Sequence, residues 1–137
     1  MRIISYWFPV IIWMGTIFFL SSRISIQVVH EEAVNFIFFK MLHVIEYSIL
    51  FVLLVRALRF TYTFANLFQM YITALMLTVL YAVTDEIHQV YVPSREGRIR
   101  DVIIDALGAG GAWIYLQLLS QKIPKKLRVW GKNLGIN

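Results

Sequence analysis

Acids, arginines and histidines are the side chains best suited to proton transfer, metal ligation or phosphate binding, and they concentrate in two parts of the chain. The first part is HVIEY, in which His43, Glu46 and Tyr47 stand at positions i, i+3 and i+4 and therefore share one helical face. The second part is TDEIHQVYVPSREGRIRDVIIDALGAGGA, residues 84–112. Its charged and polar candidates are Asp85, Glu86, His88, Gln89, Arg95, Glu96, Arg98, Arg100, Asp101 and Asp105. The two parts can form one site only if the elements that carry them meet.

Almost everything around these residues is apolar. The chain has 137 residues, of which 59% are apolar or aromatic, whereas a soluble domain has about 45–50%. The stretches with little or no charge are residues 3–20, 42–55, 67–84 and 102–119. A bilayer tolerates no unpaired backbone group, so each stretch is expected to form an α-helix. The sequence therefore predicts an all-α membrane protein with a bundle of four transmembrane helices. Because the chain has no cysteine, disulfides and thiolate metal sites are excluded.

The positions of lysine and arginine predict the orientation of this bundle. With four spans, the N-terminus, the second loop and the C-terminal tail lie on one side of the membrane. That side carries Arg2, Arg56, Arg59, Lys122, Lys125, Lys126, Arg128 and Lys132, and the other carries Arg23, Lys40, Arg95, Arg98 and Arg100. The excess of positive charge favours the first side as cytoplasmic, with both termini inside the cell. We expect a transmembrane domain over residues 1–121 and a basic cytoplasmic tail over residues 122–137.

The same topology brings the polar residues to one face of the membrane. The first and third helices end at the outer face, and the second and fourth begin there. We therefore expect a ligand-binding site formed by His43, Glu46, Tyr47, Asp85, Glu86, His88, Gln89, Arg95, Arg98, Asp101 and Asp105. The structural alternative is that the acids pair with the arginines and only hold the bundle together. Desolvation can exceed the attraction within a buried ion pair, so we favour a functional role.

These motifs resemble those of the VanZ family of small bacterial membrane proteins. That family has two serines after the first helix, then H-x-x-E-Y, D-E-x-x-Q, a proline-small-Arg turn, and an Asp that opens a last helix rich in small residues. The matching residues here are Ser21 and Ser22; His43, Glu46 and Tyr47; Asp85, Glu86 and Gln89; Pro93, Ser94 and Arg95; and Asp101 with Gly108. Ser94 stands where the family commonly has Gly, and Asp105 where Asn is common.

The resemblance implies a multi-pass protein of the bacterial cytoplasmic membrane with a role in the cell envelope. The family takes its name from a member that lowers susceptibility to teicoplanin. We expect the outer-face site to bind a lipid-linked cell-wall intermediate or a lipoglycopeptide, with arginines as donors to phosphate or carboxylate and with Tyr47 and Tyr91 beside the sugar or lipid. Membrane lipids are the expected partners, and nothing in the sequence predicts a nucleic-acid partner.

Two alternative functions use the same residues. The first is a membrane-embedded enzyme that acts on a polyprenyl-phosphate-type lipid by acid–base catalysis or with a divalent metal such as Mg, Mn or Zn. The chain has no H-E-x-x-H or comparably tight metal motif, so we assign no metal ligands, no cofactor and no catalytic residues. The second is a small transporter, which would need to form an oligomer because the chain has only four short helices. No inverted repeat is visible in the sequence to support this function.

Overall fold

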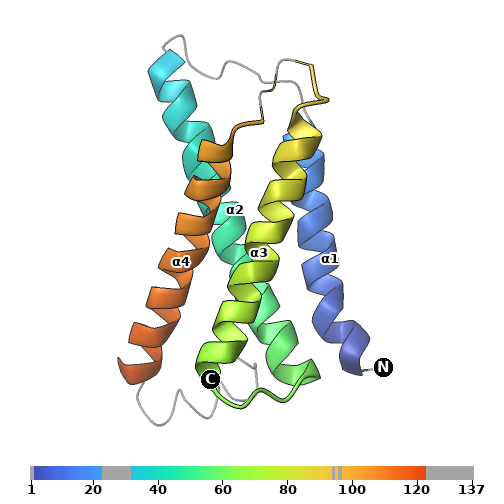
Figure 1. Ribbon diagram of the computed structural model, residues 1–137, viewed down its shortest axis with the longest axis vertical. Helices are drawn as coiled ribbons and strands as arrows, with labels where there is room; N and C mark the ends of the chain where they lie inside the picture. The colour runs from blue at the N-terminus through green and yellow to red at the C-terminus, as the bar shows by residue number, and fades with distance from the viewer. Residues whose placement is uncertain (1, 23–31, 94, 96, 123–137) are drawn as a thin grey trace.

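The computed structural model describes residues 2–22, 32–93, 95 and 97–122, and over these it is all-helical, without a strand (Figure 1). Its helices are α1 (Arg2–Ser21), α2 (Glu32–Thr61), α3 (Leu67–Gln89) and α4 (Ile99–Lys122). The predicted fold class, an all-α protein, is therefore confirmed. The C-terminal tail from residue 123 onward, together with Ser94 and Glu96 of the turn before α4, lies outside the described residues.

Helices α1 to α3 have the length and composition of membrane-spanning segments. The apolar spans are Ile3–Ser21, Ile37–Thr61 and Leu67–Gln89. The shortest of these has 19 residues, or roughly 28 Å, close to the thickness of the hydrocarbon core. Helix α4 is less apolar because it carries Asp101, Asp105 and a run of glycine and alanine. The protein is thus a helical membrane protein, and its fourth predicted span is a helix that is less apolar than the others.

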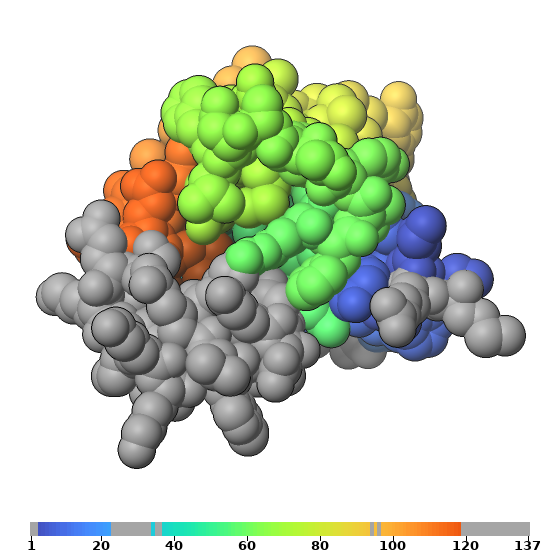
Figure 2. All heavy atoms as spheres, turned by 90° about the horizontal axis from the view of Figure 1, so that it is seen from below, coloured from blue at the N-terminus to red at the C-terminus, as the bar shows by residue number. Residues whose placement is uncertain are grey.

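The four helices run alternately up and down, and α2 packs against each of the other three (Figure 1). Seen end-on in Figure 2, α1 and α4 lie on opposite sides of the bundle, with α2 and α3 between them. Fully buried side chains such as Ile17, Leu50 and Phe51 fill the centre, while Ile4, Ile11 and many other large apolar side chains lie on the outside. This inverted surface is typical of helices that face lipid.

Helices α2 and α4 approach each other closely at Gly108. A Cβ atom added there would lie 2.8 Å from the carbonyl oxygen of Val44, so no larger residue fits without a shift of the backbone. The hydroxyl of Ser48 lies 2.9 Å from the carbonyl oxygen of Gly108 and joins the two helices at the same level. Helix α4 has two pairs of small residues at a spacing of four, Gly108 with Ala112 and Ala106 with Gly110. The first pair faces α2, whereas a Cβ on Gly110 would meet no neighbour.

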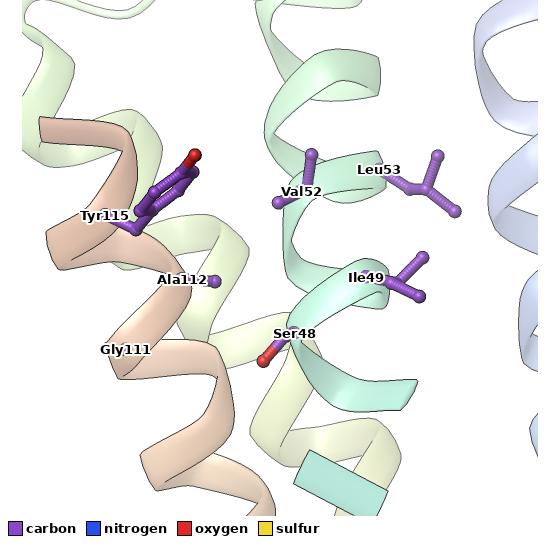
Figure 3. A pocket seen from close by; sticks show the side chains of 7 residues that line it. All are labelled: Ser48, Ile49, Val52, Leu53, Gly111, Ala112 and Tyr115. Atoms are coloured by element: carbon purple, nitrogen blue, oxygen red, sulfur yellow. The ribbon is translucent and has the colours of Figure 1, made fainter. Parts of the chain in front are cut away.

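Beyond this contact the two helices leave a shallow groove of about 420 Å³ (Figure 3). Ser48, Ile49, Val52 and Leu53 of α2 line one side of it, and Gly111, Ala112 and Tyr115 of α4 line the other. Its lining is almost entirely apolar, as expected for a surface that faces lipid tails.

We call the end of the bundle where α1 and α3 end and α2 and α4 begin the charged end. The connection from α3 to α4 turns there through hydrogen bonds from the Val92 amide to Gln89 and from the Arg95 amide to Val92. Gly97 is needed in this turn because there is no space for a side chain, and not because of its backbone freedom. A Cβ at Gly97 would collide with the carbonyl oxygen of Glu86, so close packing of the turn onto α3 requires the glycine.

Candidate functional site

The end of α1 is attached to α3 by two serine hydroxyls. Ser21 donates a hydrogen bond of 2.6 Å to Oδ1 of Asp85, and the hydroxyl of Ser22 lies 3.0 Å from Nε2 of His88. The ring of Phe18 packs on the His88 imidazole, with 4.2 Å between the ring centroids. Asp85 is almost fully buried by these contacts. The serine pair that follows α1 therefore positions the acid and the histidine of α3.

A second set of hydrogen bonds holds α3 to the turn that precedes α4. Gln89 donates to Asp85 at 3.0 Å and to Glu86 at 3.4 Å, which is one helical turn of reach along α3. The backbone N–H of Arg98 donates to Oε2 of Glu86 at 2.9 Å. Both acids are buried, and each accepts hydrogen bonds, which is how a carboxylate is stabilised away from water.

The residues that face each other between α2 and α4 form what we call the buried cluster: Lys40, His43, Glu46, Tyr47, Asp101 and Asp105. Lys40 pairs with Oδ2 of Asp101 at 2.5 Å, at the first turn of α4. The Nδ1 atom of His43 lies 3.7 Å from Glu46 and 3.9 Å from Asp105, close enough for electrostatic attraction and too far for a hydrogen bond.

Arg95 lies above this cluster at the charged end. Its guanidinium carbon lies 5.9 Å from the centre of the Phe39 ring of α2. Asp85 accepts hydrogen bonds from Ser21 and Gln89, one to each of its carboxylate oxygens, and neither donor is an arginine.

The core of the buried cluster contains polar atoms that are shielded from solvent. Tyr47 is 0% exposed, Asp105 1% and His43 9%. Over the described part of the chain, Nδ1 of His43, the hydroxyl of Tyr47 and Oδ2 of Asp105 have no hydrogen-bond partner. An unpartnered polar atom in such a place costs about 1–3 kcal/mol, and folded proteins contain few of them.

This cluster combines carboxylates, a phenol, an imidazole and an ammonium group that is paired with Asp101, so it can accept hydrogen bonds from hydroxyl groups. A metal ion would need several ligands at one point. Among the described residues, no group of three or more His, Cys, Asp or Glu side chains could hold one.

The comparison with known families now adds to this geometry. The sequence model of the VanZ/LLP1 family matches residues 6–120. The chain belongs to the VanZ/LLP1 family. No curated protein and no solved structure matches it. The match includes all but the outermost residues of the four helices, and with them every VanZ motif quoted from the sequence.

The VanZ motifs come from different helices and lie at the charged end, where contacts join α1 to α3 and α2 to α4. Two of the residues that we expected to contact the ligand are placed differently from the other predicted site residues. Arg98 is exposed, and the contact described above uses its backbone. Tyr91, which we expected beside a ligand together with Tyr47, is 80% exposed on the turn after α3, while Tyr47 is wholly buried. The two tyrosines therefore do not form a pair.

Three residues of the charged end were not among the predicted site residues: Lys40, Ser21 and Ser22. Lys40 precedes His43 by three positions, so the same helical spacing that groups His43 with Tyr47 also includes it. The serines were noted as a motif, but their partners on α3 lie more than sixty positions away in the sequence. No local spacing could indicate that contact.

Proposed function

We propose that the charged end binds the polar headgroup of a lipid-linked intermediate of the cell envelope. The observation that carries the proposal is the set of buried polar atoms on His43, Tyr47 and Asp105 that lack hydrogen-bond partners in the described structure. A headgroup that offers complementary donors and acceptors would offset their desolvation. A site that served only to fasten helices would be expected to satisfy these atoms within the protein.

The mixture of charges favours a headgroup with both phosphate and hydroxyl groups. Carboxylates such as Glu46 and Asp105 accept hydrogen bonds from sugar hydroxyls, and the Tyr47 phenol can donate or accept. Arg95, on the turn before α4, can supply positive charge for a phosphate, whereas the charge of Lys40 is paired with Asp101. A sugar linked to a lipid through phosphate combines both features, and a glycopeptide antibiotic with a lipid tail offers sugars without the phosphate.

The proposal includes a position in the membrane. Helix α4 packs along α2 and α3 at the same depth, and its 24 residues extend for roughly 36 Å, so we propose that it is the fourth span. By the distribution of lysine and arginine, the termini are cytoplasmic and the charged end faces the outside of the bacterial cytoplasmic membrane. A reporter fused after Lys122 and a second one in the turn between α3 and α4 would test this orientation.

Removal of one hydroxyl group tests the binding function. Tyr47→Phe deletes a polar atom without a protein partner, so we expect the free energy of unfolding in detergent to be unchanged or slightly increased. The amount of phosphate-containing lipid that copurifies, measured by mass spectrometry, should fall strongly. Tyr115→Phe is the matched control, because Tyr115 is 62% exposed on α4 and outside the cluster. If Tyr47→Phe instead destabilises the protein and keeps its lipid, the cluster is structural.

Teicoplanin susceptibility of cells that express the protein provides a second measurement. We expect the wild type to lower susceptibility and Tyr47→Phe to lose this effect at equal protein level. One observation also favours an enzyme, since Nδ1 of His43 lies near the carboxylates of both Glu46 and Asp105, and such groups are the usual acids and bases of proton-transfer catalysis. The test is to add a polyprenyl-phosphate ester to purified protein, with and without divalent metal. Conversion of the ester would show that the protein is an enzyme and not only a binding protein.

A further inference from the structure

The second feature of interest is an apolar groove of about 540 Å³ between α1 and α3. These two helices touch only slightly along their length and are joined at the charged end by the serine contacts of α1. Below that junction, buried residues of the core, Val10 and Leu50, form the floor of the groove. Its rims are Ile11 on α1 and Leu80 on α3, which are 64% and 61% exposed. The groove is therefore open sideways, toward the lipid.

The groove is almost entirely apolar, and one end of it lies close to the buried cluster. At the end near the cluster it is lined by Tyr81 and Thr84, and Thr84 directly precedes Asp85. The ring of Tyr81 also lies 6.3 Å from the ring of Tyr47, whose hydroxyl belongs to the buried cluster. Away from that end the lining is apolar. Along α3 the lining runs from Thr84 down to Leu77, which is roughly 10 Å of helix.

We propose that this groove holds the hydrocarbon chain of the same lipid whose headgroup occupies the buried cluster. A molecule that fits both places is polar at one end and apolar over the rest, which matches an apolar groove that ends beside a polar cluster. The volume lies within the range of about 300–1,000 Å³ found for ligand pockets. The inference rests on the proposed function and narrows it, because the ligand is then a long-chain lipid that enters from the side, out of the bilayer.

The size of the expected effect follows from the environment. A chain that leaves the bilayer for an apolar groove gains no hydrophobic free energy, because lipid tails are as apolar as leucine. The groove therefore acts by packing and by aligning the headgroup with the cluster. We expect its contribution to affinity to be about tenfold, less than that of the polar contacts.

The test uses full-length protein in nanodiscs of phosphatidylcholine and two probes, a long-chain polyprenyl phosphate and a soluble short-chain isoprenyl phosphate. Leu80→Trp and Ile11→Trp place a bulky ring at each rim of the groove. Leu107→Trp is the matched control, since Leu107 is 69% exposed on α4 and does not line the groove. The rim variants should weaken binding of the polyprenyl phosphate about tenfold and leave the short-chain phosphate unaffected, and Leu107→Trp should change neither.

Two results would overturn the inference, and they differ from each other. If the rim variants bind the polyprenyl phosphate as the wild type does while Tyr47→Phe does not, the groove holds no chain and the headgroup site stands. If the wild type binds neither probe, the proposed function itself fails and the inference with it. A photoreactive group in the chain of the lipid gives an independent measurement, with crosslinks expected on α1 and α3 and not on α4.

Discussion

The two ends of the bundle are stabilised in different ways. At the end opposite the charged one, which we call the aromatic end, the indole of Trp7 donates to Thr61 at 2.9 Å and the rings of Tyr6 and Phe60 stack at 4.5 Å. A chain of ring contacts continues there through Tyr71 and Trp113. The charged end instead uses carboxylates, an ammonium group, histidines and serines. The aromatic end thus joins its helices mainly through rings and a neutral hydrogen bond, together with a cation–π contact in which the guanidinium carbon of Arg56 lies 5.6 Å from the centre of the Tyr6 ring.

The number of unpartnered polar atoms separates the two ends further. Within the described residues, the aromatic end has one buried polar atom without a hydrogen-bond partner, the indole nitrogen of Trp113. The charged end has such atoms on His43, Tyr47, Asp101 and Asp105. Charge at membrane depth costs about 2.5–3.5 kcal/mol per group on insertion scales. This difference between the two ends supports the proposal that the polar groups of the charged end serve a ligand.

The largest loss of stability is expected when the ion pair between α2 and α4 is broken. Lys40→Met removes the 2.5 Å ion pair with Asp101, in which the two side chains are 19% and 9% exposed, and leaves Asp101 the more distant contact with the exposed Arg100 at 3.7 Å. We expect the free energy of unfolding in mixed micelles to fall by about 3 kcal/mol, the lower end for a buried pair because Lys40 is partly hydrated. Lys40→Met combined with Asp101→Leu should recover most of the loss. A single variant as stable as the wild type would mean that even this pair does not fasten the charged end.

A smaller loss is expected where α2 and α4 touch without charge. Gly108→Ala forces a Cβ against the backbone of Val44 and should cost about 2 kcal/mol, typical of overpacking. Gly110→Ala is the control on the same helix, since its Cβ meets nothing and alanine is the better helix former by up to about 1 kcal/mol. The two variants should shift the unfolding midpoint in opposite directions. Equal shifts would argue against close packing of α4 on α2.

The smallest effect is expected at the aromatic end, and it should be one of stability alone. Thr61→Val removes the acceptor of the Trp7 indole and should cost between about 0.6 and 1 kcal/mol, as for hydrogen bonds between membrane helices. Thr63→Val, at an exposed position, is the control. Lipid copurification should be the same for both variants and the wild type. Loss of bound lipid in Thr61→Val would show that the two ends do not act separately.

Much of the fold could be predicted because it depends on local sequence. Long uncharged stretches require helices in a membrane, and the four helices are found where the apolar stretches predicted them. Spacing also placed His43 and Tyr47 on one face of α2. Spacing could not show that this face meets α4, nor that Tyr47 is fully buried while Tyr91 is exposed. Those outcomes depend on how the helices rotate about their axes, which their neighbours decide.

The amino-acid sequence by itself determined that the chain is helical, suited to a membrane and a carrier of VanZ motifs, because hydropathy and helical periodicity are properties of neighbouring residues. Only the tertiary structure decided which polar atoms are satisfied. Asp85 accepts a hydrogen bond from Ser21, and Asp101 pairs with Lys40, each on another helix. The Tyr47 hydroxyl has no hydrogen-bond partner within the described part of the chain. Hydrogen bonds form over a few ångströms in space, and packing at Gly108 and at the end of α1 sets those distances.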